Sequence, residues 1–285
     1  LKLSTGEQWK TFQPRPCLFG SMIALLLSAA VTFIRLQSSS ALSIAGSAVS
    51  KAAEKVTVEL YYEVLCPTCA AYISEQVAAV WADKDLRELV QFDLYPFGNG
   101  EASMRSIGAS GRFSREFSFE CQHGEEECLG NMIQHCAMQL HDDPDVYLPM
   151  IICMEATTRT SEFSVSQIGE SCASTNGFDW SAINDCVASR EAQEDMYEIA
   201  TYSNSLDPAR EWVPWVTVEG QHDGSAEMGQ LTERVCAVLT QKGGSLPAVC
   251  QSEELFRSRH NLTEDMKRSR PVCMGPGPVA DTVEK

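Results

Sequence analysis

Two cysteines at C-x-x-C spacing, Cys66 and Cys69, are the residues whose type and spacing point most directly to chemistry. They follow the apolar, β-rich run Val56–Leu65 and open a segment with helical spacing of apolar residues. A thiol at a helix N-terminus ionises easily, because unpaired backbone N–H groups and the helix dipole stabilise the thiolate. The pattern therefore indicates thiol–disulfide exchange.

A C-x-x-C pair has three possible uses. A redox pair needs an attacking thiolate and a resolving thiol, a zinc site needs two further Cys or His ligands, and a structural disulfide needs nothing else. The strand-to-helix position favours the redox pair. In that interpretation Cys66 is the exposed nucleophile and Cys69, one turn inside the helix, resolves the mixed disulfide, while Pro67 suits the first helical turn.

A second cysteine-rich stretch runs from Cys121 to Cys136 and contains three cysteines and two histidines. Such a set could hold zinc, but Cys136 falls on the apolar stripe of an expected helix and other cysteines are available as partners. We therefore expect disulfide stapling here and no metal. His123 could donate a proton to a leaving thiolate, although a histidine at a helix start is more often a hydrogen-bonding structural residue.

Twelve cysteines spread along the chain indicate an oxidising compartment during folding. Of these, eight form an even set that could make four structural disulfides, with connectivity open among 105 pairings: Cys121, Cys128, Cys136, Cys153, Cys172, Cys186, Cys236 and Cys250. Cys236 with Cys250 is the single pairing we expect, since Gly243-Gly244 lets the chain fold back. Cys273 is left over, and is free, paired between chains, or removed with the tail.

The chain divides into three parts. Residues 1–50 place basic residues before an uncharged stretch from Cys17 to Ile34 and then small residues, which is typical of a secretory signal, although a retained membrane anchor has a similar length. Residues 51–253 form the expected folded domain. Residues 254–285 form a polar tail that carries the glycosylation sequon at Asn261.

Within the folded domain, patterning predicts a strand over 56–65, a helix over 69–81, a strand over 89–97, a mainly helical insertion over about 100–205, strand character over 212–218 and a closing helix over 231–239. This order predicts an α/β, thioredoxin-like fold with a helical, disulfide-stapled insertion. In such a fold a cis proline begins a strand facing the C-x-x-C and its backbone pairs with substrate, so Val213 and Pro214 are the expected substrate-binding residues. The alternative is that Pro214 simply starts an edge strand.

Composition narrows the function. A formal net charge of −17 argues against nucleic-acid binding, because phosphates are held by clustered Lys and Arg. The sequence carries no flavin or nicotinamide fingerprint, so we expect no cofactor. Membrane contact is expected only if the N-terminal apolar segment is retained.

The stretch Cys121–Cys136 fits C-Q-H-G-x-x-E-C-x-x-N-x-x-x-x-C at every fixed position and resembles the signature of the gamma-interferon-inducible lysosomal thiol reductase (GILT) family. The similarity covers roughly Val56 to Cys250, including the C-x-x-C after Tyr61-Tyr62-Glu63 and the segment Val213–Val218. It implies a thioredoxin-like enzyme that reduces protein disulfides at acid pH in endosomes and lysosomes through Cys66 and Cys69. Acid activity requires a strongly stabilised thiolate, since an ordinary thiol has a pKa near ~8.5.

Two other functions share these residues. One is a secretory-pathway disulfide oxidase or isomerase, which differs in reduction potential. The other is a redox-inert, disulfide-stapled binding protein. For the reductase the expected partners are disulfide-containing protein substrates and a small-thiol or thioredoxin-type electron donor, and the expected state is a monomer or a disulfide-linked dimer.

Overall fold

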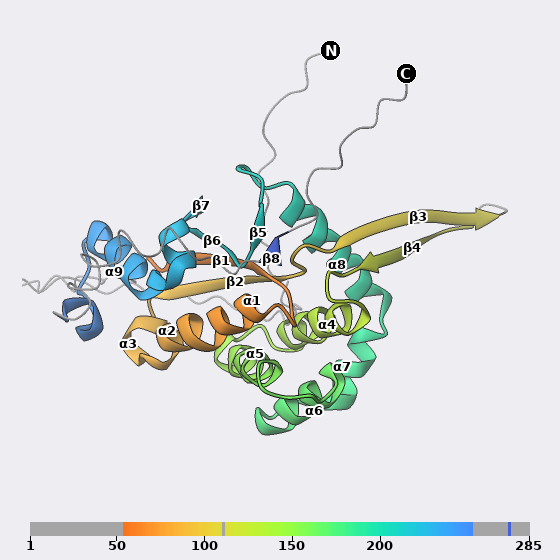
Figure 1. The fold of residues 1–285 in the computed structure, drawn as a ribbon, viewed down its shortest axis with the longest axis horizontal. Coiled ribbons are helices and arrows are strands. Elements are labelled where there is room, and N and C mark those ends of the chain that lie inside the picture. Colours follow the sequence, from red (N-terminus) through yellow and green to blue (C-terminus); the bar gives the residue numbers. More distant parts are fainter. Residues whose placement is uncertain (1–53, 110–111, 253–272, 275–285) are drawn as a thin grey trace, which may run out of the picture. The chain divides into compact units, whose positions relative to one another are not determined.

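The structure, a computed structural model, describes residues 54–109, 112–252 and 273–274 (Figure 1). The predicted signal or anchor over 1–50, the sequon at Asn261 and most of the predicted tail lie outside these residues. Among the helices of the described ranges, none has the length and apolar character needed to cross a membrane.

A four-stranded sheet forms the centre of the domain, in the order β2-β1-β6-β7. Strands β1 (Val56–Tyr62) and β2 (Val90–Pro96) run parallel, whereas β6 (Trp215–Val218) is antiparallel to β1 and to β7 (Gln221–His222). The apolar residues of β1 point alternately to the two faces of the sheet. Both faces are therefore available for helix packing.

Helices connect β1 to β2 and close the domain. The connection consists of α1 (Pro67–Tyr72), a π-helical turn η1 (Ile73–Val77), α2 (Ala78–Ala82) and α3 (Lys84–Arg87). After β7, η2 (Ala226–Gln230) leads into α9 (Leu231–Lys242), which contacts α2 and β1. On the other face, Tyr61 stacks on Tyr95 with ring centroids 4.6 Å apart, and Tyr202 of the insertion covers both rings.

The insertion between β2 and β6 begins with a hairpin and continues with helices. The hairpin strands are β3 (Glu101–Ala109) and β4 (Arg112–Glu120), and five helices follow: α4 (Glu125–Leu140), α5 (Pro144–Thr158), α6 (Val165–Thr175), α7 (Trp180–Val187) and α8 (Arg190–Asn204). A helical insertion from about residue 100 was therefore the wrong expectation for its first twenty residues.

The physical reason for the hairpin lies in alternating aromatic residues on β4. Phe117 and Phe119 point to the same side of the strand, where Phe119 meets Phe97 at 6.2 Å and Phe117 meets Tyr197 at 5.5 Å between ring centroids. Residues two apart lie on the same face in an extended strand but not in a helix, so only a strand lets both rings pack on the same side.

Disulfides fasten the helices to one another. Cys136–Cys186 joins α4 to α7, Cys153–Cys172 joins α5 to α6, and Cys121–Cys128 closes the loop that precedes α4. Cys236–Cys250, the pairing expected from the sequence, joins α9 to the 3₁₀ turn η3 (Ala248–Gln251). All eight cysteines of the expected structural set are paired with one another.

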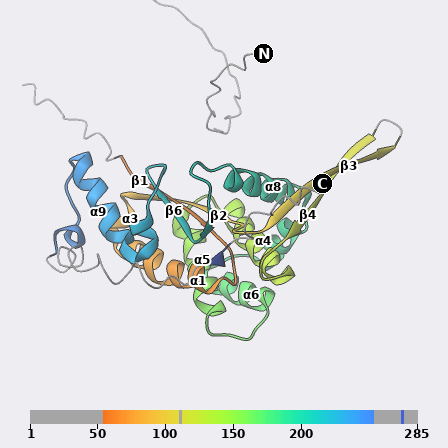
Figure 2. The ribbon, with the colours of Figure 1, turned by 45° about the horizontal axis from the view of Figure 1, so that its top comes forward.

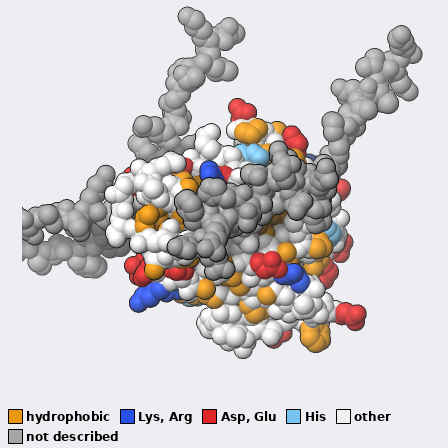
Figure 3. Space-filling view, turned by 60° about the vertical axis from the view of Figure 1, so that its left-hand side comes forward, with side chains coloured by type: hydrophobic (Ala, Val, Ile, Leu, Met, Phe, Trp, Pro, Cys, Tyr) orange, Lys and Arg blue, Asp and Glu red, His pale blue; other side chains and the backbone are white. Residues whose placement is uncertain are grey.

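Two short strands complete the description. β5 (Trp212–Val213) pairs antiparallel with β8 (Cys273–Met274), and Figures 1 and 2 both show β8 beside the start of α1. On the face in Figure 3, acidic side chains of described residues lie at several separate places. The strand order, with a β-α-β unit, an insertion and a closing β-β-α unit, confirms the predicted α/β, thioredoxin-like fold.

Candidate active site

The C-x-x-C lies at the junction of β1 and α1. Cys66 is the N-cap residue of α1, Pro67 occupies the first helical turn, and the Cys66 sulfur accepts a hydrogen bond from the backbone N–H of Cys69 at 3.5 Å. Leu65 has a φ of 69°, a left-handed conformation that few side chains adopt, and it turns the chain sharply before the first cysteine. The junction therefore gives the Cys66 sulfur a backbone donor.

The structure corrects one expectation about this pair. Cys66 is bonded to Cys273 rather than to Cys69, and Cys69 is the free cysteine among the described residues. Both Cys66 and Cys69 are fully buried, whereas the sequence predicts an exposed Cys66. Cys66 is buried because its sulfur, which was expected to be exposed to solvent, is covered by the half-buried Cys273 to which it is bonded.

The segment that contains Val213 and Pro214 lies next to the Cys66–Cys273 disulfide. The Val213–Pro214 peptide bond is cis, as expected, and Val213 pairs with Cys273 across the β5–β8 ladder. The structure thus brings Val213 and Cys66 to the two sides of one residue, Cys273.

A buried carboxyl group, Glu63, lies beside the sulfurs. Glu63 is fully buried, its Oε2 accepts from the backbone N–H of Asn99 at 2.7 Å, and its Oε1 has no hydrogen-bond partner. One carboxylate oxygen lies within 4.8 Å of the sulfurs of Cys66 and Cys273. Burial, and secondly the nearby Glu127 carboxylate, raise the pKa of Glu63 to about 8, against the lowering effects of the Asn99 N–H and Arg210.

Cys69 lies in the same acidic surroundings. Burial raises the pKa of the Cys69 thiol well above its ordinary value, and the carboxylates of Glu63, Glu155 and Glu127 act in the same direction, whereas a hydrogen bond from the Glu63 backbone acts against them. Glu155 is fully buried, and burial raises its pKa to about 8 despite a hydrogen bond from Gln134. Below that pH two of the three carboxyl groups are neutral, so they oppose a thiolate less at acid pH.

The Cys121–Cys136 stretch supports this site from α4 and from the turn before it. The Gln122 Oε1 accepts from the Asn99 side-chain amide at 3.0 Å, and the Asn131 Oδ1 accepts from the backbone N–H of Val64 at 2.9 Å. A Cβ on Gly130 would lie 2.6 Å from Val64, so only glycine allows α4 to come this close to the end of β1. The stretch therefore fixes the backbone just before Cys66.

His123 makes hydrogen bonds of the kind expected of a structural histidine. The His123 Nδ1 lies 2.8 Å from the Glu127 Oε2 and 3.6 Å from the Glu63 carboxylate. The same Glu127 oxygen also accepts a hydrogen bond from the His123 backbone N–H at 2.6 Å. Glu63, His123 and Glu127 could in principle hold a cation, but the hydrogen bond between the last two already uses these atoms. The cysteines of the stretch are in disulfides, so they offer no thiolates to zinc.

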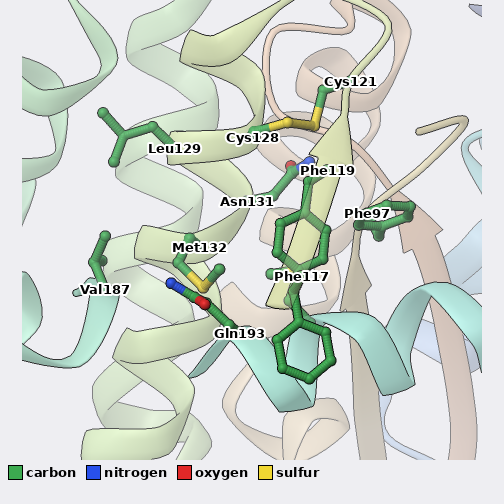
Figure 4. Close-up of a pocket in the computed structure, with 11 residues that line it drawn as sticks. Phe97, Phe117, Phe119, Cys121, Cys128, Leu129, Asn131, Met132, Val187 and Gln193 are labelled. Carbon is green, nitrogen blue, oxygen red and sulfur yellow. A yellow bond between two sulfur atoms is a disulfide. The ribbon is translucent and has the colours of Figure 1, made fainter. Parts of the chain in front are cut away.

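An apolar cavity of about 210 Å³ adjoins the other side of the same stretch (Figure 4). Phe97, Phe119 and Met132 line it, together with the Cys121–Cys128 disulfide, and Asn131 lies between the cavity and the end of β1.

Sequence reasoning missed several residues of the site. Glu63 carried a signal, since it is a charged residue near the end of an otherwise apolar strand. Asn99 belongs to Phe97-Gly98-Asn99, a segment that resembles the family of the signature stretch, but its role was missed because its side-chain partners, Gln122, Arg210 and the Cys273 carbonyl, are distant in the sequence.

A thioredoxin-like fold with a C-x-x-C at the start of its first helix and a cis proline nearby defines a thiol–disulfide oxidoreductase. The sequence profile of the Gamma interferon inducible lysosomal thiol reductase (GILT) family matches residues 57–176. The Gamma-interferon-responsive lysosomal thiol protein of Arabidopsis thaliana is 33% identical over 200 residues, 70% of this chain and 76% of that protein. The Gamma-interferon-inducible lysosomal thiol reductase of Carassius auratus is 30% identical over 201 residues, 70% of this chain and 73% of that protein. The chain therefore belongs to the GILT family, as its signature predicted.

Two solved structures are similar to this chain at lower sequence identity. BdbD from Bacillus subtilis has a TM-score of 0.46 at 13% identity, covering 67% of this chain and 90% of its own. DsbA from Chlamydia trachomatis has a TM-score of 0.44 at 12% identity, covering 66% of this chain and 86% of its own.

Proposed function

We propose that this chain is a thiol reductase that reduces disulfide bonds of protein substrates through Cys66 and Cys69, at acid pH in the endosomal and lysosomal pathway. The observation that carries the proposal is the position of the Cys66 sulfur. It caps α1 and is already engaged in a disulfide with an extended segment paired to β5. That is the arrangement of a mixed disulfide between the nucleophile and a bound strand.

The reaction follows from this arrangement. The Cys66 thiolate attacks one sulfur of a substrate disulfide, forming a mixed disulfide and releasing the other sulfur as a thiol. The Cys69 thiolate, three residues on in the same helix, then attacks the Cys66 sulfur and releases the second substrate thiol. The resulting Cys66–Cys69 disulfide takes two electrons from a small-thiol or thioredoxin-type donor to restore the dithiol.

The backbone at β5 positions the substrate in this scheme. Val213 pairs with the residue whose sulfur is bonded to Cys66, and Pro214 follows it directly. An extended segment bound there presents its cysteine to Cys66 through main-chain hydrogen bonds.

The buried carboxyl groups support activity at acid pH. Glu63 has a carboxylate oxygen within 4.8 Å of the sulfurs and a pKa raised to about 8, first by burial, so at acid pH it is a neutral carboxyl that can give a proton to a leaving thiolate. His123, Glu127 and Arg210 face the same carboxyl group.

The direction of the reaction is tested by equilibrating the full chain with glutathione redox buffers at pH 5 and at pH 7 and measuring the reduced fraction of Cys66. A reductase gives a reducing equilibrium and reduces the disulfides of insulin at pH 5. A strongly oxidising equilibrium would indicate the oxidase or isomerase instead, and an unresponsive pair would indicate a redox-inert binding protein.

A further inference from the structure

The segment that carries Cys273 occupies the place where a substrate segment is expected. Cys273 is 207 residues from Cys66 in the sequence, yet the two sulfurs are bonded. The same residue pairs with Val213 in an antiparallel ladder, and Met274 pairs with Trp212. Two independent contacts, one covalent and one through the backbone, therefore place this segment on the edge of β5.

The described contacts of the segment are with its main chain and with one sulfur. Besides the ladder, the side-chain amide of Asn99 donates to the carbonyl oxygen of Cys273 at 2.9 Å. Arg210 donates to the Asn99 Oδ1 at 2.6 Å, and the Asn99 backbone N–H donates to the buried Glu63, so the amide is held in place. A site built in this way selects an extended strand with a cysteine opposite Val213.

We propose, on the basis of the proposed function, that Cys273 is a third redox cysteine of this chain. It acts as a tethered substrate that occupies the active site. There it exchanges with Cys69, and with protein substrates, as the partner bonded to the Cys66 sulfur. This use of Cys273 differs from the three alternatives that the sequence left open.

Each exchange balances without a further oxidant. In the resting chain, Cys69 loses its proton and its thiolate attacks the Cys66 sulfur. The Cys66–Cys69 bond forms, the Cys66–Cys273 bond breaks, and Cys273 leaves with the electron pair and takes up a proton. During turnover, the Cys273 thiolate attacks a mixed disulfide between Cys66 and substrate in the same way, forming Cys66–Cys273 and releasing the substrate as a thiol.

A tethered thiol competes well with thiols in solution. Its effective concentration is on the order of 1 mM, about 100 times that of a substrate protein at ~10 µM. Cys273 is therefore expected to release trapped substrate when the normal resolving thiol is missing.

The test compares three full-length variants, each reduced, freed of reductant and mixed with insulin: Cys69→Ser, Cys69→Ser with Cys273→Ser, and Cys69→Ser with the tail control Ser269→Ala. Acid-quenched samples are alkylated and their disulfides are mapped by mass spectrometry. We expect the mixed disulfide with insulin to last at least tenfold longer in the variant without Cys273 than in the other two, which accumulate Cys66–Cys273 within one chain.

The outcomes separate the inference from the function. Mixed disulfides with equal lifetimes in all three variants, or a Cys66–Cys273 bond found only between chains, would overturn the inference while leaving the reductase intact. The absence of any insulin adduct on Cys66 in the variant without Cys273 would instead overturn the proposed function. Oxidised wild-type chain provides a second readout, since the inference requires its digest to contain Cys66 joined to Cys273 and Cys69 as a free thiol.

Discussion

The side-chain amide of Asn99 donates to the carbonyl oxygen of Cys273 at 2.9 Å and so contacts the backbone of the segment whose sulfur is bonded to Cys66. If protein substrates take the place of this segment, Asn99→Ala removes one hydrogen bond from each bound substrate. One such bond contributes about 1 kcal/mol, so KM for insulin is expected to rise about fivefold with little change in kcat.

Gln122→Ala is the matched control, because it removes a different hydrogen bond of the same amide and leaves the contact with the substrate backbone in place. A lower kcat at constant KM in Asn99→Ala would show that the residue acts on the chemical step and not on substrate binding.

Glu63→Gln separates the charge of the buried carboxyl from its shape. Burial raises the pKa of Glu63 to about 8, so the wild type and the variant both carry a neutral side chain below that pH. Above it, wild-type Glu63 gains a negative charge within 4.8 Å of the Cys66 sulfur, which opposes a thiolate by about 1–3 kcal/mol. We expect the reduced variant to react with iodoacetamide about tenfold faster than the wild type at pH 9 and at the same rate at pH 6.

Glu88→Gln on the surface controls for the loss of a carboxylate as such. Alkylation profiles of Glu63→Gln and wild type that coincide from pH 6 to 9 would mean that Glu63 does not govern the thiols.

Stability is expected to fall as pH rises, because two buried glutamates hold protons in the folded state. The folded pKa of Glu155 is raised by burial to about 8, whereas the ordinary value is 4.5. The proton therefore contributes stability fully below about pH 4.5, and this contribution is lost as pH rises through about 8. Each pKa unit corresponds to ~1.4 kcal/mol, and Glu63 adds to the effect in the same direction.

Thermal unfolding followed by circular dichroism at pH 5 and pH 8 measures this dependence. Glu155→Gln imitates the protonated form and should lose less stability than the wild type between the two pH values, while the exposed Glu170→Gln should behave like the wild type. A wild type that is more stable at pH 8 would refute the assignment.

The sequence was sufficient to predict the parts of the fold that depend on local patterning. The strand β1, the helix that begins after Cys66, and the closing helix α9 all follow from apolar periodicity and turn residues. The β3–β4 hairpin was missed because its aromatic residues alternate only over a short stretch and pack on Phe97 and Tyr197, partners that become visible only in the folded chain.

In the candidate site, too, local features could be predicted from the sequence and contacts between distant segments could not. Cys66 and Cys69 could be found from spacing, since their position at the end of a strand is local. The bond between Cys66 and Cys273 could not, because a separation of 207 residues and a choice among many cysteines leave nothing for the sequence to select. Polar partners such as Asn99 with Arg210 depend likewise on the packing of distant segments.

Gly130 tests whether the signature stretch positions the nucleophile. In Gly130→Ala, the added methyl group would meet a Val64 methyl at 2.6 Å and push α4 away from the end of β1. We expect a loss of about 1–3 kcal/mol of stability, as for other overpacked sites, and a fall in kcat for insulin. Val64→Ala in the same chain should restore part of both.

Gly244→Ala is the control, since its added Cβ meets no atom within 4 Å. A Gly130→Ala protein with wild-type stability and turnover would show that the close approach of α4 is unimportant.

In the proposed reaction the Cys66 sulfur attacks the substrate and Cys69 resolves the intermediate. The most direct measurement is mass spectrometry of the reduced Cys69→Ser, Cys273→Ser double variant after mixing with insulin at pH 5, beside a Cys66→Ser protein. We expect a stable adduct joined through Cys66 in the double variant and no turnover in Cys66→Ser. An adduct joined through another cysteine, or wild-type reduction of insulin by Cys66→Ser, would contradict it.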